Sequence, residues 1–164
     1  MTSAPPPPPG WKLQPAIPTS QQQAHDTVLR YLKKTLQALP AGTVIDATGY
    51  AGPGQNTPCD DNATSPNSAV AFSTIGNLQS PGNPNWDAII AKIGDVWKSW
   101  GWRVMERDGF YKPNRFGYAP DGYNLQIESR GRPGYPPSLV GVSPCFPGDL
   151  ARDDIPFPLV VRAD

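Results

Sequence analysis

Residues 83–107, NPNWDAIIAKIGDVWKSWGWRVMER, hold the clearest helix of this sequence and the strand that follows it. Asn83 and Pro84 are typical of a helix N-cap and first helical position, and Gly101 is typical of the residue that ends a helix. Between them, large apolar residues recur at steps of three and four, which predicts an amphipathic helix. Its apolar face comprises Trp86, Ile89, Ile90, Ile93, Trp97 and Trp100. The stretch 102–107 then predicts a strand.

A second amphipathic helix is predicted upstream, over residues 20–39. Ser20 and Gln23 form the S-x-x-Q pattern of a capping box, and Pro40 and Gly42 end the helix. Its apolar residues fall on one face at helical spacing. They are Ala24, Val28, Leu29, Leu32, Leu36 and Leu39.

The remaining regular segments are short and predict strands at 43–48, 68–75, 123–128 and 139–143. Residues 49–67 are expected to form a long loop, and residues 108–122 a loop or an irregular hairpin. Two helices and about five strands in this order predict an α+β fold, a two-layer sandwich with both helices on one face of a mainly antiparallel sheet.

The domain organisation follows from composition. Residues 1–19 contain Pro5–Pro9, a run typical of an extended polyproline II segment, and we interpret them as a linker or tether. Residues 20–148 are expected to form one α+β domain, and 149–164 a C-terminal extension or edge segment. The proline run has two readings, a ligand for an SH3-like groove or a spacer from a membrane anchor outside this sequence. We favour the spacer.

Charge excludes several classes of partner. The chain has 14 basic and 14 acidic residues among 164, so its formal net charge is zero. This argues against binding to nucleic acid or to an anionic membrane through bulk charge. No segment approaches the ~20 apolar residues that span a bilayer.

The two cysteines, Cys59 and Cys145, lie in proline-flanked loops. They lack the spacing of a redox motif or a zinc site, so they are either one structural disulfide or two unrelated buried thiols. The disulfide is the favoured prediction, and it implies an oxidising, extracytoplasmic location.

This layout resembles small cell-envelope lipoprotein domains of mycobacteria and related actinobacteria, of the LppA-like kind. The matching elements are the first helix, the strand 43–48 leading to Cys59, the second helix before Gly101, the strand 122–127 and the late strand ending at Cys145. The resemblance implies an exported, lipid-anchored domain. The cysteine that carries the lipid in such proteins has no counterpart here, and no site residues are carried over.

A binding surface is predicted in the aromatic stretch 110–118. It contains Phe110, Tyr111, Arg115, Phe116 and Tyr118, and tyrosine beside arginine is enriched at protein interfaces. The amide of Asn114 is suited to hydrogen bonding with a sugar or a lipid headgroup. The alternative is a loop that folds back over the edge of the sheet.

Catalytic signatures are missing from the sequence. His25, the only histidine, has no nucleophile motif beside it, and we expect it to face solvent on the first helix. The acid pairs 60–61 and 153–154 are expected to be solvated loop residues. Glu106 and Glu128 are conceivable partners across the sheet, and Arg107 is a conceivable ion-pair partner for either. We predict no catalytic residue, metal or cofactor.

The favoured function is an exported, membrane-tethered envelope domain that binds a protein or an envelope component without catalysis. One alternative is a carboxylate-based envelope hydrolase. Another is a carrier for a lipid or other apolar ligand, with a cavity lined by Leu32, Leu36, Ile89 and Ile93.

Overall fold

The computed structural model describes residues 5–60, 62, 65–152 and 154–164, and they form an α+β fold as predicted. The helices are α1 (Gln21–Gln37) and α2 (Trp86–Ser99). The strands are β1 (Val44–Asp46), β2 (Gln55–Pro58), β3 (Val70–Gln79), β4 (Arg103–Met105), β5 (Asn114–Tyr118), β6 (Asn124–Glu128), β7 (Ser138–Val142) and β8 (Val160–Val161). A short 3-10 turn, η1 (Gly148–Leu150), precedes β8.

The sheet has eight strands, so the expectation of about five strands is wrong. Its order is β4-β5-β6-β7-β3-β1-β8, with β2 also paired to β3, and every pairing is antiparallel. The three additional strands are β2 inside the predicted loop 49–67, β5 inside the predicted loop or hairpin, and β8 in the C-terminal extension. Val161 of β8 pairs with Ile45, so this end of the chain forms an edge of the sheet.

Both helices end close to their predicted boundaries. The Ser20 hydroxyl accepts a hydrogen bond from the Gln23 amide at 3.1 Å, which confirms the cap of α1. The cap of α2 is Asn85 rather than Asn83, and its side chain accepts from the Ala88 amide at 3.1 Å. Both asparagines are residue types that suit a cap. Because α2 starts at Trp86, Pro84 lies outside the helix and Asp87 lies in the first turn, near the positive end of the helix dipole.

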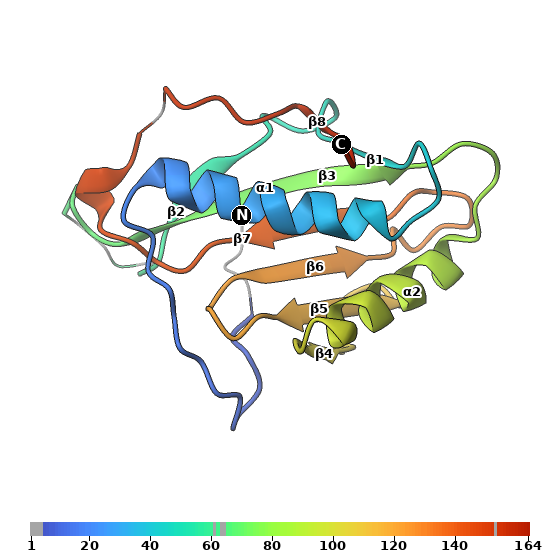
Figure 1. The fold of residues 1–164 in the computed structure, drawn as a ribbon, viewed down its shortest axis with the longest axis horizontal. Helices are drawn as coiled ribbons and strands as arrows, with labels where there is room; N and C mark the ends of the chain where they lie inside the picture. The colour runs from blue at the N-terminus through green and yellow to red at the C-terminus, as the bar shows by residue number, and fades with distance from the viewer. Residues whose placement is uncertain (1–4, 61, 63–64, 153) are drawn as a thin grey trace.

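The two helices cover one face of the sheet (Figure 1). A Cβ added to Gly117 of β5 would lie 2.6 Å from Trp97 of α2, and one added to Gly141 of β7 would lie 2.9 Å from Val28 of α1. These glycines therefore allow close approach of the helices. Gly117 and Gly141 both pair with Leu125, so the three residues share the helix-covered face.

Strand alternation then places Asn114, Phe116 and Tyr118 of β5 on the opposite face, which no described helix covers. We call this the helix-free face. The side chains of β6 and β7 that share it are Asn124, Gln126, Glu128, Ser138, Val140 and Val142.

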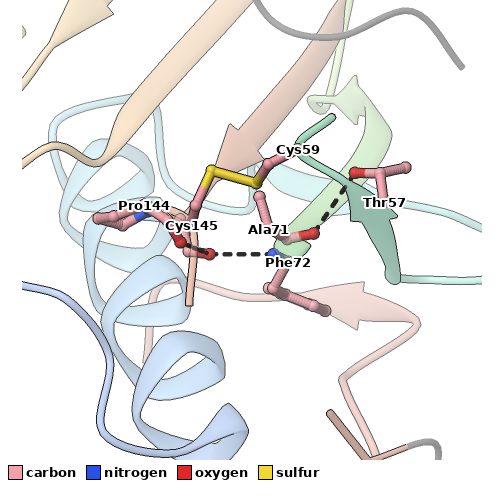
Figure 2. Close-up of a disulfide and its surroundings, with 7 residues drawn as sticks. Thr57, Cys59, Ala71, Phe72, Pro144 and Cys145 are labelled. Carbon is pink, nitrogen blue, oxygen red and sulfur yellow. Dashed lines mark hydrogen bonds between the residues drawn. A yellow bond between two sulfur atoms is a disulfide. The ribbon is translucent and has the colours of Figure 1, made fainter. Parts of the chain in front are cut away.

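The predicted disulfide is present between Cys59 and Cys145, whose Cα atoms are 6.4 Å apart. It joins the end of β2 to the segment after β7, across the start of β3 (Figure 2). Beside it, the Phe72 amide donates to the Ser143 hydroxyl at 2.9 Å. The interpretation as two unrelated buried thiols is therefore wrong. Within the described residues, neither helix has the length and apolar composition of a membrane-spanning segment.

Candidate functional site

The five predicted binding residues fall into three places. Phe116 and Tyr118 lie on the helix-free face of β5, and Phe110 packs on Phe116 with ring centroids 4.8 Å apart. Arg115 points to the other face, where its guanidinium lies 3.2 Å from a Glu106 carboxylate oxygen. Tyr111 is 63% exposed and lies apart from the other aromatic side chains, against the 131–134 turn.

Arg107 joins the aromatic group, whereas the sequence analysis considered it only as an ion-pair partner for Glu106 or Glu128. Its guanidinium carbon lies 5.5 Å from the ring centroids of both Phe116 and Tyr118. Its Nε and Nη2 atoms donate to the Tyr118 hydroxyl at 3.1 and 2.9 Å. We call Arg107, Phe110, Phe116 and Tyr118 the β5 surface.

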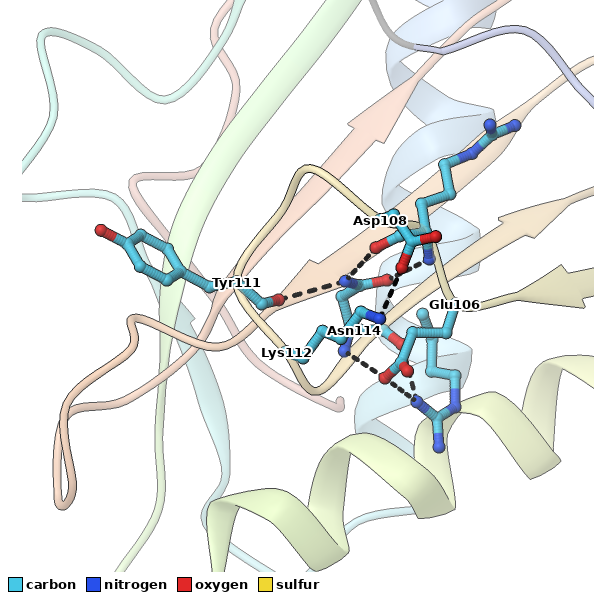
Figure 3. A network of polar contacts seen from close by, with 7 residues as sticks. Glu106, Asp108, Tyr111, Lys112 and Asn114 are labelled. Atoms are coloured by element: carbon cyan, nitrogen blue, oxygen red, sulfur yellow. Dashed lines mark hydrogen bonds and ion pairs between the residues drawn. The ribbon is translucent and has the colours of Figure 1, made fainter.

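Asn114 holds the loop that carries this surface (Figure 3). Its side chain is 0% exposed, and its Oδ1 accepts from the Arg107 amide at 2.9 Å. Its Nδ2 donates to the carbonyls of Arg107 and Tyr111 at 3.0 and 3.1 Å. Since the amide is buried and fully used, the predicted role of Asn114 in contacting a sugar or headgroup is wrong. It positions Arg107 instead.

Ion pairs complete the same loop. Lys112 Nζ lies 2.6 Å from a carboxylate oxygen of Asp108, and Arg115 bridges Glu106 to the backbone carbonyl of Asn114 (Figure 3). The Asp108 hydrogen bond and charge raise the pKa of Lys112, and Lys112 lowers the pKa of Asp108. Both side chains of that pair are exposed, so it contributes little to stability.

The proline run lies on the β5 surface. The Tyr118 hydroxyl donates to the Pro5 carbonyl at 3.2 Å, and Arg107 Nη2 donates to the Pro6 carbonyl at 2.5 Å. The run then reverses in a turn, where the Trp11 amide donates to the Pro8 carbonyl at 3.3 Å. Proline followed by glycine suits the two central positions, because Gly10 has a φ of +84°.

The returning chain holds the turn between β5 and β6. The Trp11 indole donates to the Ala119 carbonyl at 3.5 Å. The amides of Gln14 and Ala16 donate to the carbonyls of Pro120 and Asp121 at 2.8 and 2.9 Å. Residues 5–16 thus clasp the β5–β6 turn from both sides, and we call them the N-terminal clasp. Figure 1 shows this dark-blue segment looping past the ends of β5 and β6 before it reaches α1.

Burial reinforces the protonated state of the central tyrosine. Phe116 and Tyr118 are only 1% and 2% exposed, although they face away from the helices. Burial raises the pKa of Tyr118, and the hydrogen bond from Arg107 opposes this shift. An unshifted tyrosine is already protonated at neutral pH, and burial only strengthens this, so the phenol is available to donate to the Pro5 carbonyl.

Comparison with known proteins identifies no family for this chain. No family model matches it, and no curated protein or solved structure matches it significantly. The resemblance to actinobacterial lipoprotein domains therefore stays a prediction.

His25 is buried, so the expectation that it faces solvent is wrong. Its ring packs on Phe72, with centroids 3.9 Å apart. The Gln21 Oε1 atom accepts from Asn56 Nδ2 at 2.8 Å and from the Arg152 amide at 2.5 Å, so the Gln21 amide nitrogen must face His25. That nitrogen lies 3.0 Å from His25 Nε2, which must accept the hydrogen bond and is therefore unprotonated.

The acidic residues do not converge. Glu106 is bound by Arg115 and the Asn114 amide, whereas a Glu128 oxygen accepts from the Tyr111 amide at 3.1 Å. The acid pairs 60–61 and 153–154 lie partly outside the described residues. Among the residues that are described, no three histidine, cysteine, aspartate or glutamate side chains gather where they could hold a metal ion.

The side chains named for a lipid cavity are part of the packed core. Leu32, Leu36, Ile89 and Ile93 are all buried and belong to one continuous cluster that joins the helices to the sheet. This packing argues against a carrier that encloses an apolar ligand at that position.

Proposed function

We propose that this protein is an exported, non-catalytic domain of the cell envelope that binds a protein partner through the β5 surface. The disulfide supports the compartment, because such bonds persist in oxidising environments. The clasp, which precedes the domain, supports a role for the proline-rich segment at the binding surface as well as in tethering.

One observation carries the proposal. Two side chains of the β5 surface donate hydrogen bonds to backbone carbonyls of a segment more than 100 positions away: Tyr118 to Pro5 and Arg107 to Pro6. Aromatic rings beside an arginine are the composition of binding hot spots. A surface that already holds one polypeptide segment is suited to holding another.

Photo-cross-linking in the native envelope tests this function. Phe110 is 38% exposed at the rim of the β5 surface, so a benzoylphenylalanine placed there should reach a bound partner. The matched control is the same replacement at Tyr135, which is 52% exposed and lies on a different loop.

We expect one reproducible adduct from position 110 and none from position 135. The cross-linked partner should be identified by mass spectrometry. When the purified partner is mixed with this protein, it should shield position 110 from solvent. Equal yields from the two positions, or no adduct from either, would contradict the proposal.

A further inference from the structure

We infer that the β5 surface recognises proline-rich segments in the polyproline II conformation, and that the chain's own proline run is a built-in competitor for this site. The inference rests on the proposed function and names its ligand class. It also assigns a regulatory role to Pro5–Pro8, of which Pro5 and Pro6 contact the site in the structure described here.

The polar chemistry of the contact fits a proline backbone. Proline has no amide hydrogen, so a run of prolines offers only carbonyl acceptors. The two groups that contact the run, the Tyr118 hydroxyl and Arg107 Nη2, are both donors. They reach the carbonyls of two consecutive residues, Pro5 and Pro6, which fixes the position of the run on the surface.

The donors are oriented before the run binds. Arg107 donates twice to the Tyr118 oxygen, so these bonds occupy acceptor positions of the hydroxyl and leave its one hydrogen free to be donated. The backbone of Arg107 is fixed by the buried amide of Asn114. A preorganised pair of donors loses little side-chain entropy on binding, which favours recognition of a stiff ligand.

The apolar chemistry also fits. Grooves lined with aromatic rings are the usual binding sites for polyproline II segments, since these segments are extended and preformed. Phe110, Phe116 and Tyr118 bring aromatic rings to the surface that carries the two donors. Pro5, Pro7 and Pro8 are partly buried whereas Pro6 and Pro9 are exposed, so the run presents one side to the domain.

The proline run is attached to the β5 surface by noncovalent contacts that can break and form again. The Trp11 indole, Gln14 and Ala16 hold the returning half of the clasp to the β5–β6 turn, and the Trp11 amide joins this half to the Pro8 carbonyl. Release of the Pro5 and Pro6 carbonyls therefore breaks none of the hydrogen bonds to the β5–β6 turn. A tethered competitor acts at an effective concentration on the order of 1 mM, so partners with weaker proline segments are excluded.

The test uses the full chain with its own run weakened as a competitor, because serine keeps the backbone carbonyls but loses the proline rings and the fixed φ that favours polyproline II. The vacated variant carries P5S, P6S, P7S and P8S and keeps the Pro9–Gly10 turn. The probe is a fluorescein-labelled octaproline peptide, with a glycine-serine peptide of equal length as the control ligand, and the readout is fluorescence anisotropy. Circular dichroism confirms that each variant is folded.

We expect octaproline to bind the vacated variant and to bind the wild-type chain about ten-fold more weakly, because the tethered run competes. Y118F in the vacated variant should weaken binding about five-fold through the loss of one hydrogen bond. The matched control is Y135F, since Tyr135 also has an arginine, Arg132, 5.5 Å from its ring centroid. It should leave the affinity unchanged.

Failure of octaproline to bind the folded vacated variant would overturn the inference, as would equal effects of Y118F and Y135F. A positional cross-link at 110 together with such a failure would leave the proposed function standing and show that the partner is not proline-rich. If the four-fold variant does not fold, P7S with P8S replaces it, because Pro7 and Pro8 are partly buried. Octaproline should then bind more tightly than it binds the wild-type chain, and an affinity equal to wild type would count against the competitor.

Discussion

Acidification should destabilise this protein through His25, the single histidine of the chain. The ring is 4% exposed and accepts a hydrogen bond from Gln21, so the folded state favours the neutral form. Burial lowers its pKa, although the charge of Asp26 and the carbonyl of Pro156 oppose the shift. The folded pKa is then lower than that of the unfolded chain, which is about 6.5.

The sign follows from proton linkage. Above pH 6.5 the histidine is neutral in both states and does not affect stability. Below that value the unfolded chain binds a proton that the folded chain resists, so stability falls. At pH 5.0 this amounts to at most about 2 kcal/mol, the full free energy of protonating an exposed histidine with a pKa of about 6.5.

The assay is urea unfolding of the wild-type chain and of H25Q between pH 7.5 and 5.0. Carboxylates contribute equally to the two proteins, so the difference between their pH slopes isolates the histidine. Because only one histidine is present, its ring resonances also give the folded pKa directly by NMR. Identical slopes for the two proteins, or a folded pKa at or above 6.5, would refute the buried neutral histidine.

Three further perturbations probe the fold. Replacing Cys59 and Cys145 by serine should lower the free energy of unfolding by about 4–5 kcal/mol in the chain-entropy model, since 86 positions separate them. A loss under about 1 kcal/mol in urea melts would show that the disulfide constrains the unfolded chain little. G117A should cost about 1–3 kcal/mol through overpacking, whereas G52A, with open space around the added Cβ, should be nearly neutral in thermal melts. Burial, reinforced by a hydrogen bond to a carboxylate, raises the pKa of Tyr31 to about 12. The free energy of unfolding should therefore fall as pH rises from about 10 toward 12, and it should fall less steeply in Y31F. Alkaline unfolding curves that superimpose for the two proteins would contradict this prediction.

The helices were predictable because their apolar residues follow a strong period. The same helical spacing places His25 on the buried face of α1, because it lies three positions before Val28 and seven before Leu32. A polar residue type concealed that pattern. Its hydrogen-bond partner Gln21 is oriented by Asn56 and Arg152, which come from distant segments, so the network that keeps the ring neutral could not be inferred locally.

The missed strands lack local strand character. β2 reads Gln55–Pro58 and is a strand because it pairs with β3, while β8 has two residues that depend on β1. β5 contains Gly117, whose missing side chain makes room for Trp97. The same glycine interrupts the alternation of apolar and polar residues that would have indicated a strand. The sequence predicted a binding surface in the aromatic stretch 110–118, but the division of this stretch between two faces required the register of β5.

Arg107 and the clasp could not be predicted from neighbours in the sequence. The hydrogen bond from Arg107 to Pro6 joins residues 101 positions apart, and no local pattern links a proline run to a particular arginine. The sequence predicted an extended segment, whereas the chain reverses in a turn at Pro9 and Gly10. Its position on the domain depends on two donors that the fold brings to the helix-free face.

The most direct test of the β5 surface as the binding surface is an NMR map of the vacated variant during titration with octaproline. We predict amide shifts concentrated in residues 105–119, together with the side-chain resonances of Arg107 and Tyr118, and little change in the 129–137 loop. Shifts centred on another part of the sheet, or no shifts at peptide concentrations on the order of the 1 mM expected for the tethered run, would contradict the account.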